Sequence, residues 1–145
     1  MTMPGRAIPP ETGSRASVVR GGGGGYHAEQ GSDCQPGISA ETVGAKALWL
    51  GIATIPPGKR TKAHVHEHHE TAFYMLSGEE LELWTGDQLQ YRDLVRPGDY
   101  LYIPANVLHV AINRGTKPAV FLGARNEPTA QESVVLYPEM DSRVP

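Results

Sequence analysis

Short apolar runs bounded by turn residues recur from Ala45 to the C-terminal region, and this recurrence constrains the fold more than any other feature. The turns come about every 8–12 residues, which is the spacing of an all-β sandwich or barrel. Gly accounts for 17 and Pro for 12 of the 145 residues, in agreement with many tight turns. Strands are predicted at residues 46–55, 71–76, 80–84, 89–95, 100–103, 107–112, 119–124 and 133–137.

The chain is expected to form one domain preceded by a tail. Residues 1–39 are rich in Gly, Pro and Ser and show no hydrophobic period, so we predict a flexible tail that is at most partly ordered at a dimer interface. The glycines at 21–25 have no preceding strand and no following Gly-Lys-Ser/Thr, which favours a linker over a phosphate-binding loop. Residues 40–145 are predicted to form a small β-barrel, which at eight strands leaves room for side chains and one small ligand.

Charge and cysteine content exclude several classes of function. The 13 Lys and Arg residues against 16 Asp and Glu residues give a net charge of −3, which does not favour binding to nucleic acid or to an anionic membrane. No apolar run is long enough for a membrane span or a signal peptide, so a cytoplasmic protein is expected. Cys34 is the single cysteine, so a bound metal must be held by nitrogen and oxygen.

Histidines cluster in two segments and predict a metal site. Alternation along a strand places His64 and His66 on one face, and His109 can approach them from a facing strand. Glu70 begins the next apolar run and is predicted to add a carboxylate oxygen. Three imidazoles and one carboxylate suit a divalent transition metal, namely Mn, Fe, Ni, Zn or Cu, better than Ca or Mg. A solvated His/Glu stretch on an edge strand is the competing interpretation.

These segments resemble the two sequence motifs of the cupin family. Residues 58–78 carry the Gly, His, His, Glu and Gly of the first motif, with Gly78 one residue later than usual. Residues 98–113 carry the Gly, Pro, His and Asn of the second, with Asn106 where the family usually has Gly. Since Asn tolerates positive φ better than most residues, we expect this turn to survive the change.

The resemblance implies a small single-domain cupin, a jelly-roll or double-stranded β-helix barrel, with one metal bound by His64, His66, Glu70 and His109. Open positions on such an ion suit a metal-dependent enzyme of the oxygenase, isomerase or decarboxylase type that acts on a small organic molecule. The alternative is a non-catalytic domain that binds or senses a metal or small ligand. A sugar-modifying epimerase ranks lower, because no cluster of basic residues for phosphate lies beside the histidines.

Alternation along the strands predicts which side chains surround the metal. If Glu70 points inward, Ala72, Tyr74 and Leu76 share its face, so Glu70 and Tyr74 are the candidate catalytic residues for proton transfer. His68 and His69 are either acids or bases near the metal or, the favoured interpretation, solvated loop residues. The lone His27 and Glu67 are expected at the surface. Core or interface positions are predicted for Trp49, Trp84, Tyr100, Tyr102 and Phe121.

Assembly is predicted from exposed strand edges. The segments 46–55 and 132–137 are expected to be edge strands, and an uncovered edge is a place where a second copy can pair. The predicted partners are therefore a small-molecule ligand and a second copy of the chain, as a homodimer.

Overall fold

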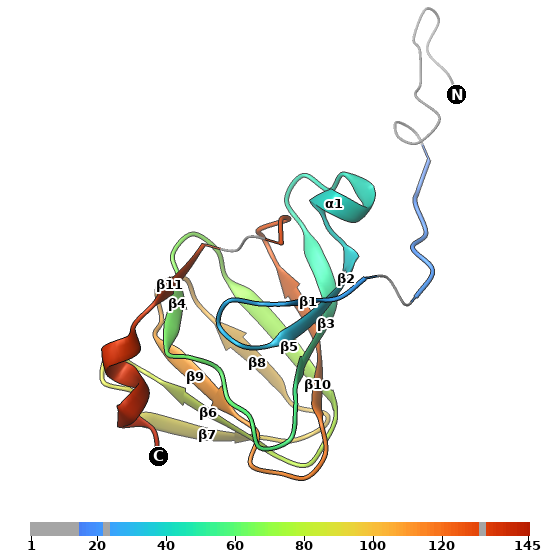
Figure 1. Ribbon diagram of the computed structural model, residues 1–145. Helices are drawn as coiled ribbons and strands as arrows, with labels where there is room; N and C mark the ends of the chain where they lie inside the picture. The colour runs from blue at the N-terminus through green and yellow to red at the C-terminus, as the bar shows by residue number, and fades with distance from the viewer. Residues whose placement is uncertain (1–14, 22–23, 131–132) are drawn as a thin grey trace, which may run out of the picture.

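The fold consists of two antiparallel β-sheets that face each other, seen in the computed structural model of Figure 1. The structure describes residues 15–21, 24–130 and 133–145. One sheet has the strand order β1-β2-β3-β10-β5-β8 and the other β11-β4-β9-β6-β7. The first sheet contains β1 (Tyr26–His27), β2 (Asp33–Ile38), β3 (Trp49–Ile55), β10 (Ala119–Arg125), β5 (Thr71–Ser77) and β8 (Tyr100–Ile103). The second contains β11 (Val134–Leu136), β4 (His64–His66), β9 (His109–Ile112), β6 (Leu81–Thr85) and β7 (Tyr91–Val95).

The predicted all-β barrel is confirmed, and each of the eight predicted strands appears with small shifts at its ends. Two short helices add to it: α1 (Ala40–Val43) and a 3₁₀ helix, η1 (Pro138–Arg143). Ser39 caps α1 through its side chain, and Gly44 ends the helix with φ 70°. No helix among the described residues is long and apolar enough to cross a membrane.

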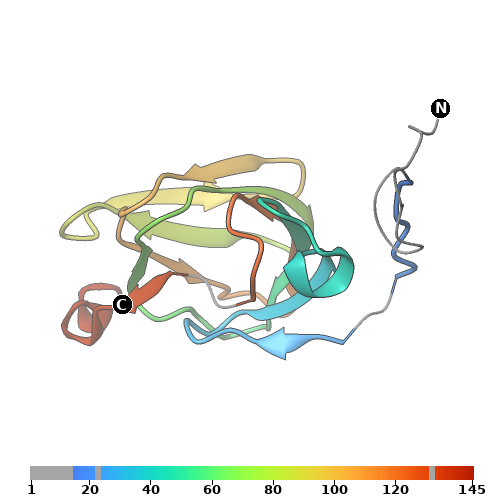
Figure 2. The same cartoon turned by 90° about the horizontal axis from the view of Figure 1, so that it is seen from above.

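The N-terminal segment differs from the prediction of a tail over 1–39. Residues 15–21 do run away from the barrel (Figure 2), but β2 pairs with β3 and buries Cys34. The sequence did not predict β2, because Pro36 and Gly37 interrupt its alternation. Its register with β3 shifts between Pro36 and Ile38. Residues 1–14 of the predicted tail lie outside the described residues.

The hydrophobic core lies between the two sheets. One cluster joins Met75 and Phe121 of the first sheet to Leu81 and Leu83 of the second. Met75 is fully buried, and the other three are less than 8% exposed. Apolar area removed from water is worth about 25 cal/mol per Å², so this contact between the sheets supplies much of the stability of the barrel.

The edges of the sheets are only partly as predicted. The segment 46–55 is not an edge, because β2 and β10 flank β3 on both sides. β11 does end the second sheet, where it pairs with β4 alone.

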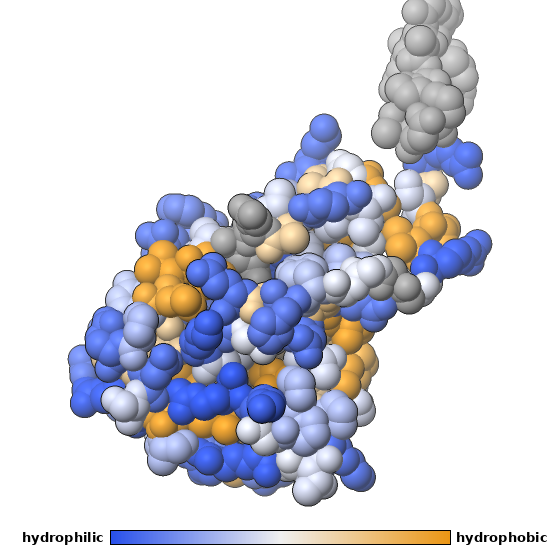
Figure 3. Space-filling model, viewed as in Figure 1, coloured by the Kyte–Doolittle hydropathy of each residue, from blue (hydrophilic) through white to orange (hydrophobic). Residues whose placement is uncertain are grey.

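Apolar side chains also remain at the surface. On the face seen in Figure 3 they form separate patches among charged and polar residues. The most exposed large aromatic residue is Tyr100, at 81%, and Tyr102 of the same strand is also exposed. Trp49 and Phe121, in contrast, are buried as predicted.

Candidate metal centre

Three histidines meet inside the barrel. His64 and His66 lie on β4, and His109 begins β9, directly opposite His64 in the antiparallel ladder. One ring nitrogen from each lies within 4.8 Å of the others, and all three residues are no more than 5% exposed. The ring centroids of His64 and His109 are 4.1 Å apart. Register and alternation thus bring the three predicted imidazoles together.

Backbone carbonyls orient two of these rings. The Nδ1–H of His64 donates to the carbonyl oxygen of Lys62 at 2.6 Å, and that of His109 donates to the carbonyl oxygen of Val107 at 2.9 Å. Because a carbonyl oxygen can only accept, the proton lies on Nδ1 and the lone pair is left on Nε2. Metal-binding histidines are held in this way, so the donor set fits a transition metal ion.

The turn before His109 takes the conformation expected from the sequence. Asn106 has φ 63°, one of two positive values among the described non-glycine residues. Its backbone N–H donates to the carbonyl oxygen of His66 at 2.8 Å. This bond connects the turn before the third histidine to the strand that carries the first two.

The structure does not bring Glu70 to the three imidazoles. Glu70 is exposed, and its Oε1 accepts a hydrogen bond from the hydroxyl of Tyr102 at 3.0 Å on the outside of the barrel. This hydrogen bond raises the pKa of Tyr102. The inward direction predicted for Glu70 is therefore wrong. β4 ends at His66 and β5 starts at Thr71, and alternation does not carry across the irregular residues between them.

The same shift corrects the predicted face of β5. Thr71 and Met75 point inward and are buried, whereas Ala72 and Leu76 are exposed. Tyr74 turns outward too, and its ring lies 4.7 Å from that of Tyr100. Tyr74 is thus not placed to act on a metal-bound molecule. The late position of Gly78 already indicated this one-residue shift. Counted back from Gly78, the usual spacing of the first motif reaches Thr71 instead of Glu70.

The remaining histidines divide between surface and interior. His68 is exposed, as favoured, and so is His27, whose Nδ1 is 2.7 Å from Asp33 Oδ1. His69 is 2% exposed, and its ring centroid is 4.5 Å from that of His66. The expectation of a solvated His69 is therefore wrong. Its ring packs beside His66 and supports the orientation of that imidazole.

An apolar cavity opens beside the imidazoles. It is lined by His64, His66 and His109 and by core side chains of both sheets, among them Phe73, Leu83 and Phe121. Its free volume is about 70 Å³. Pockets for drug-sized ligands measure about 300–1,000 Å³, so this space suits a small molecule.

A second, smaller cavity of about 30 Å³ also has His66 in its lining. Its lining includes Arg125, which is 7% exposed and whose guanidinium lies 4.1 Å from the ring centroid of Trp49. The sequence predicted no cluster of basic residues beside the histidines. Alternation from the buried Phe121 puts Arg125 inward, and this signal was not used.

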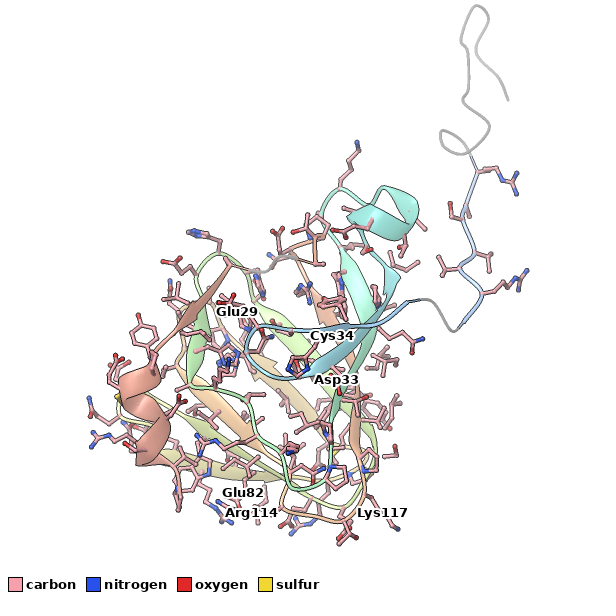
Figure 4. The ribbon with its side chains drawn as sticks, in the orientation of Figure 1. Glu29, Asp33, Cys34, Glu82, Arg114 and Lys117 are labelled. Atoms are coloured by element: carbon pink, nitrogen blue, oxygen red, sulfur yellow. The ribbon has the colours of Figure 1, made fainter. Side chains whose placement is uncertain are left out.

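A separate charged cluster surrounds Glu82 on β6. Its carboxylate accepts hydrogen bonds from Arg114 at 2.7 Å and from the indole of Trp84 at 3.0 Å, and Arg92 lies at 3.3 Å. Burial raises the pKa of Glu82, but these three partners outweigh it and lower the pKa to about 2. Figure 4 shows Glu82 and Arg114 together, toward the end of the barrel opposite α1. This cluster is a structural contact between β6, β7 and the link after β9.

Comparison with known proteins agrees with the fold and the site. The family model of the cupin domain matches residues 51–124, just over half of the chain, so the chain belongs to the cupin family. The match contains both histidine segments. The predicted fold and family are thus confirmed.

Two curated relatives show the range within this family. Quercetin 2,3-dioxygenase of Bacillus subtilis is 42% identical over 55 residues, which are 37% of this chain and 15% of that protein. Protein SchB of Streptomyces halstedii is 31% identical over 87 residues, 59% of each chain. This chain therefore spans less than two thirds of the length of either relative.

A solved structure shows the same fold at low sequence identity. The polyketide cyclase RemF from Streptomyces resistomycificus superposes with a TM-score of 0.63 over 86% of this chain and 85% of that one, at 21% identity. At this identity the likeness is one of fold.

Proposed function

We propose that this protein is a metal-dependent enzyme that acts on a small organic molecule at a centre formed by His64, His66 and His109. The observation that carries the proposal is the convergence of three buried imidazoles beside an apolar cavity. The metal is one divalent transition metal per chain, since nitrogen ligands favour Mn, Fe, Ni, Cu or Zn over Mg or Ca. The quercetin dioxygenase, a relative that is named as an enzyme, supports a catalytic role.

The proposed centre has three protein ligands, not four. Glu70 and Tyr74 have no part in it because both lie on the outside of the barrel. His64, His66 and His109 would hold the ion, and with three protein ligands it would supply Lewis-acid or redox chemistry to a molecule in the cavity. The protein holds the imidazoles of His64 and His109 in one tautomer through the carbonyls of Lys62 and Val107, and an apolar cavity lies beside them.

The cavity limits the size of the substrate. About 70 Å³ accommodates a molecule of only a few heavy atoms. A three-ring substrate such as quercetin requires a wider space than this. The proposed substrate is therefore a small molecule. The proposed reaction is its oxygenation, isomerisation or decarboxylation.

Metal analysis combined with turnover tests this function. We expect purified wild-type protein without a His tag to retain about one transition metal ion per chain. The double variant His64→Ala/His109→Ala should lose this ion, and the exposed pair His27→Ala/His68→Ala should keep it. Equal metal content in all three proteins would contradict the centre.

Oxygen consumption and product analysis with small diketones, phenols, thiols and hydroxy acids then separate an enzyme from a binding domain. We expect turnover by the wild-type protein that disappears in the His64→Ala/His109→Ala variant. Tight binding of a small ligand without turnover would instead favour the alternative, a non-catalytic binding cupin.

We also propose that two copies form a homodimer. The proposal is supported by the β11 edge of the second sheet and by exposed apolar side chains on the outer face of the first, namely Leu50, Leu76, Tyr100, Tyr102 and Leu122. Light scattering coupled to gel filtration should give twice the chain mass at micromolar concentration. A monomer would overturn this proposal.

A further inference from the structure

Three buried polar residues form a row across the first sheet, next to the histidine centre. Arg125 of β10 lies directly opposite Trp49 of β3 on one side and Thr71 of β5 on the other. Trp49 is 3%, Thr71 5% and Arg125 7% exposed. Inward-facing positions in a strand row are normally apolar, so a cation, an indole N–H and a hydroxyl together need a reason.

The guanidinium of Arg125 is fixed in place. Its Nε donates to the carbonyl oxygen of Glu127 at 3.2 Å, and its Nη2 donates to that of Thr129 at 2.7 Å. One face of the guanidinium also stacks on the ring of Trp49. An arginine does not lose its proton in proteins, so a full positive charge lies inside the barrel wall.

Its two neighbours bring further hydrogen-bonding capacity. Within the part of the chain that the structure describes, Trp49 Nε1 and Thr71 Oγ1 are buried and have no hydrogen-bond partner. A buried polar atom of this kind is unfavourable, because it has lost its hydrogen bonds to water without replacing them. Two such donors in one row with a cation indicate a binding site for an anion. Each of them can donate a hydrogen bond to the anionic ligand.

The row lines the smaller cavity beside His66. Thr71, Trp49 and Arg125 all belong to its lining, and so do His66 and Phe73. The larger cavity has His66 and Phe73 in its lining as well. The two spaces therefore border the same imidazole. The smaller one, at about 30 Å³, suits one carboxylate group.

We propose that Arg125, Thr71 and Trp49 form a carboxylate-binding subsite, and that the substrate is a small carboxylic acid. The anionic end lies in the smaller cavity near the guanidinium, whose positive charge attracts a carboxylate. The rest of the molecule extends past His66 toward the apolar cavity. This inference rests on the proposed function for the role of the metal, but carboxylate binding itself needs only the three residues of the row.

Nuclear magnetic resonance of the ¹⁵N-labelled, metal-free protein tests the subsite with acetate as the probe. Acetamide is the neutral control, because it has the same shape without the charge. Acetate should shift the indole N–H signal of Trp49. The indole of Trp84 serves as an internal reference, because its N–H already donates to Glu82. Acetamide should shift neither signal appreciably.

Variants assign the effect to the row. Thr71→Val keeps the volume and removes the hydroxyl, and we expect it to fold and to weaken acetate binding about ten-fold or more. Arg125→Met should abolish the shift. The control Thr54→Val, on β3 but on the other side of the sheet from Trp49, should leave acetate binding unchanged. If Arg125→Met does not fold, Thr71→Val decides the result, because it keeps the Trp49 indole signal.

In the metal-free protein, three results would each overturn the subsite: no shift of the Trp49 indole with acetate, an equal shift with acetamide, or unchanged acetate affinity in Thr71→Val. The same titration of the His64→Ala/His109→Ala variant separates this proposal from the proposed function. Retained acetate binding without metal supports the subsite even if the metal centre fails. A metal-loaded wild-type protein that does not bind acetate overturns the subsite alone.

Discussion

His64 and His109 lie directly opposite each other on the antiparallel strands β4 and β9, with their ring centroids 4.1 Å apart. The register of this ladder therefore determines whether the two imidazoles meet. A slip of one residue in either strand would turn one ring to the other face of the sheet. The metal centre is thus a property of strand pairing, and the predictions below test the residues that maintain it or lie outside it.

Replacement of Glu70 should leave metal binding intact. The side chain lies outside the barrel against Tyr102, so Glu70→Gln is expected to retain the wild-type metal content and metal affinity. Elemental analysis after dialysis against a chelator measures both. His66→Ala is the positive control, because it removes one of the three imidazoles. A loss of metal in Glu70→Gln as large as in His66→Ala would show that the carboxylate does reach the ion.

The carboxylate of Glu82 should stabilise the fold above acidic pH. Its folded-state pKa of about 2 lies below the ordinary value of 4.5, so its contribution is fully present above about pH 5 and is lost as the pH falls toward 2. Glu82→Gln should lower the free energy of unfolding at pH 7 by about 1–3 kcal/mol. Urea denaturation at a series of pH values measures this difference, which should shrink on acidification.

Glu80 provides the matched control for Glu82. It pairs with Arg96 at 2.6 Å, but its side chain is 40% exposed. Exposed ion pairs contribute about 0–1 kcal/mol, so Glu80→Gln should have the smaller effect. A Glu82→Gln effect that is independent of pH between 3 and 7 would contradict the assignment.

The positive φ of Asn106 should make this position sensitive to side-chain branching. Asn106→Val is expected to destabilise the protein by about 1–3 kcal/mol, because a β-branched residue is strained at φ 63°. Asn106→Gly relieves any strain and should stay within about 1 kcal/mol of the wild type. Thermal or chemical denaturation checks the pair. Equal stability of the two variants would mean that the turn relaxes to another conformation.

A side chain at Gly123 should disturb the cavities beside the histidines. An added Cβ would lie 2.7 Å from Cε1 of Phe73, a ring that lines both cavities. Gly123→Ala is therefore expected to displace this ring, to lower stability by about 1–3 kcal/mol and to weaken binding of small ligands. Gly21→Ala, with open space around it, is the control. Unchanged stability and ligand binding in Gly123→Ala would show that the ring moves without cost.

The sequence predicted the parts of this structure that depend on local pattern. Turn residues and apolar runs predicted β3 and the strands from β5 onward, and alternation along the histidine segment, which forms β4, placed His64 and His66 on the same face. Asn106 took the positive φ expected of it because few other residues tolerate that conformation.

The incorrect predictions concern segments in which the alternation of a β-strand is interrupted. Glu70 follows three irregular residues after β4, and a shift of one residue there moved Thr71 inward and Glu70 and Tyr74 outward. β2 was missed since Pro36 and Gly37 resemble a loop. Arg125 contacts Trp49 only because β10 pairs with β3, a long-range contact that no local pattern contains.

Anomalous X-ray scattering from a crystal of the metal-loaded protein tests the central claim most directly. We expect one strong peak per chain, about 2.0–2.3 Å from a ring nitrogen of each of His64, His66 and His109, with Glu70 outside its coordination sphere. A peak coordinated by Glu70, or metal bound only elsewhere on the chain, would contradict a three-histidine centre.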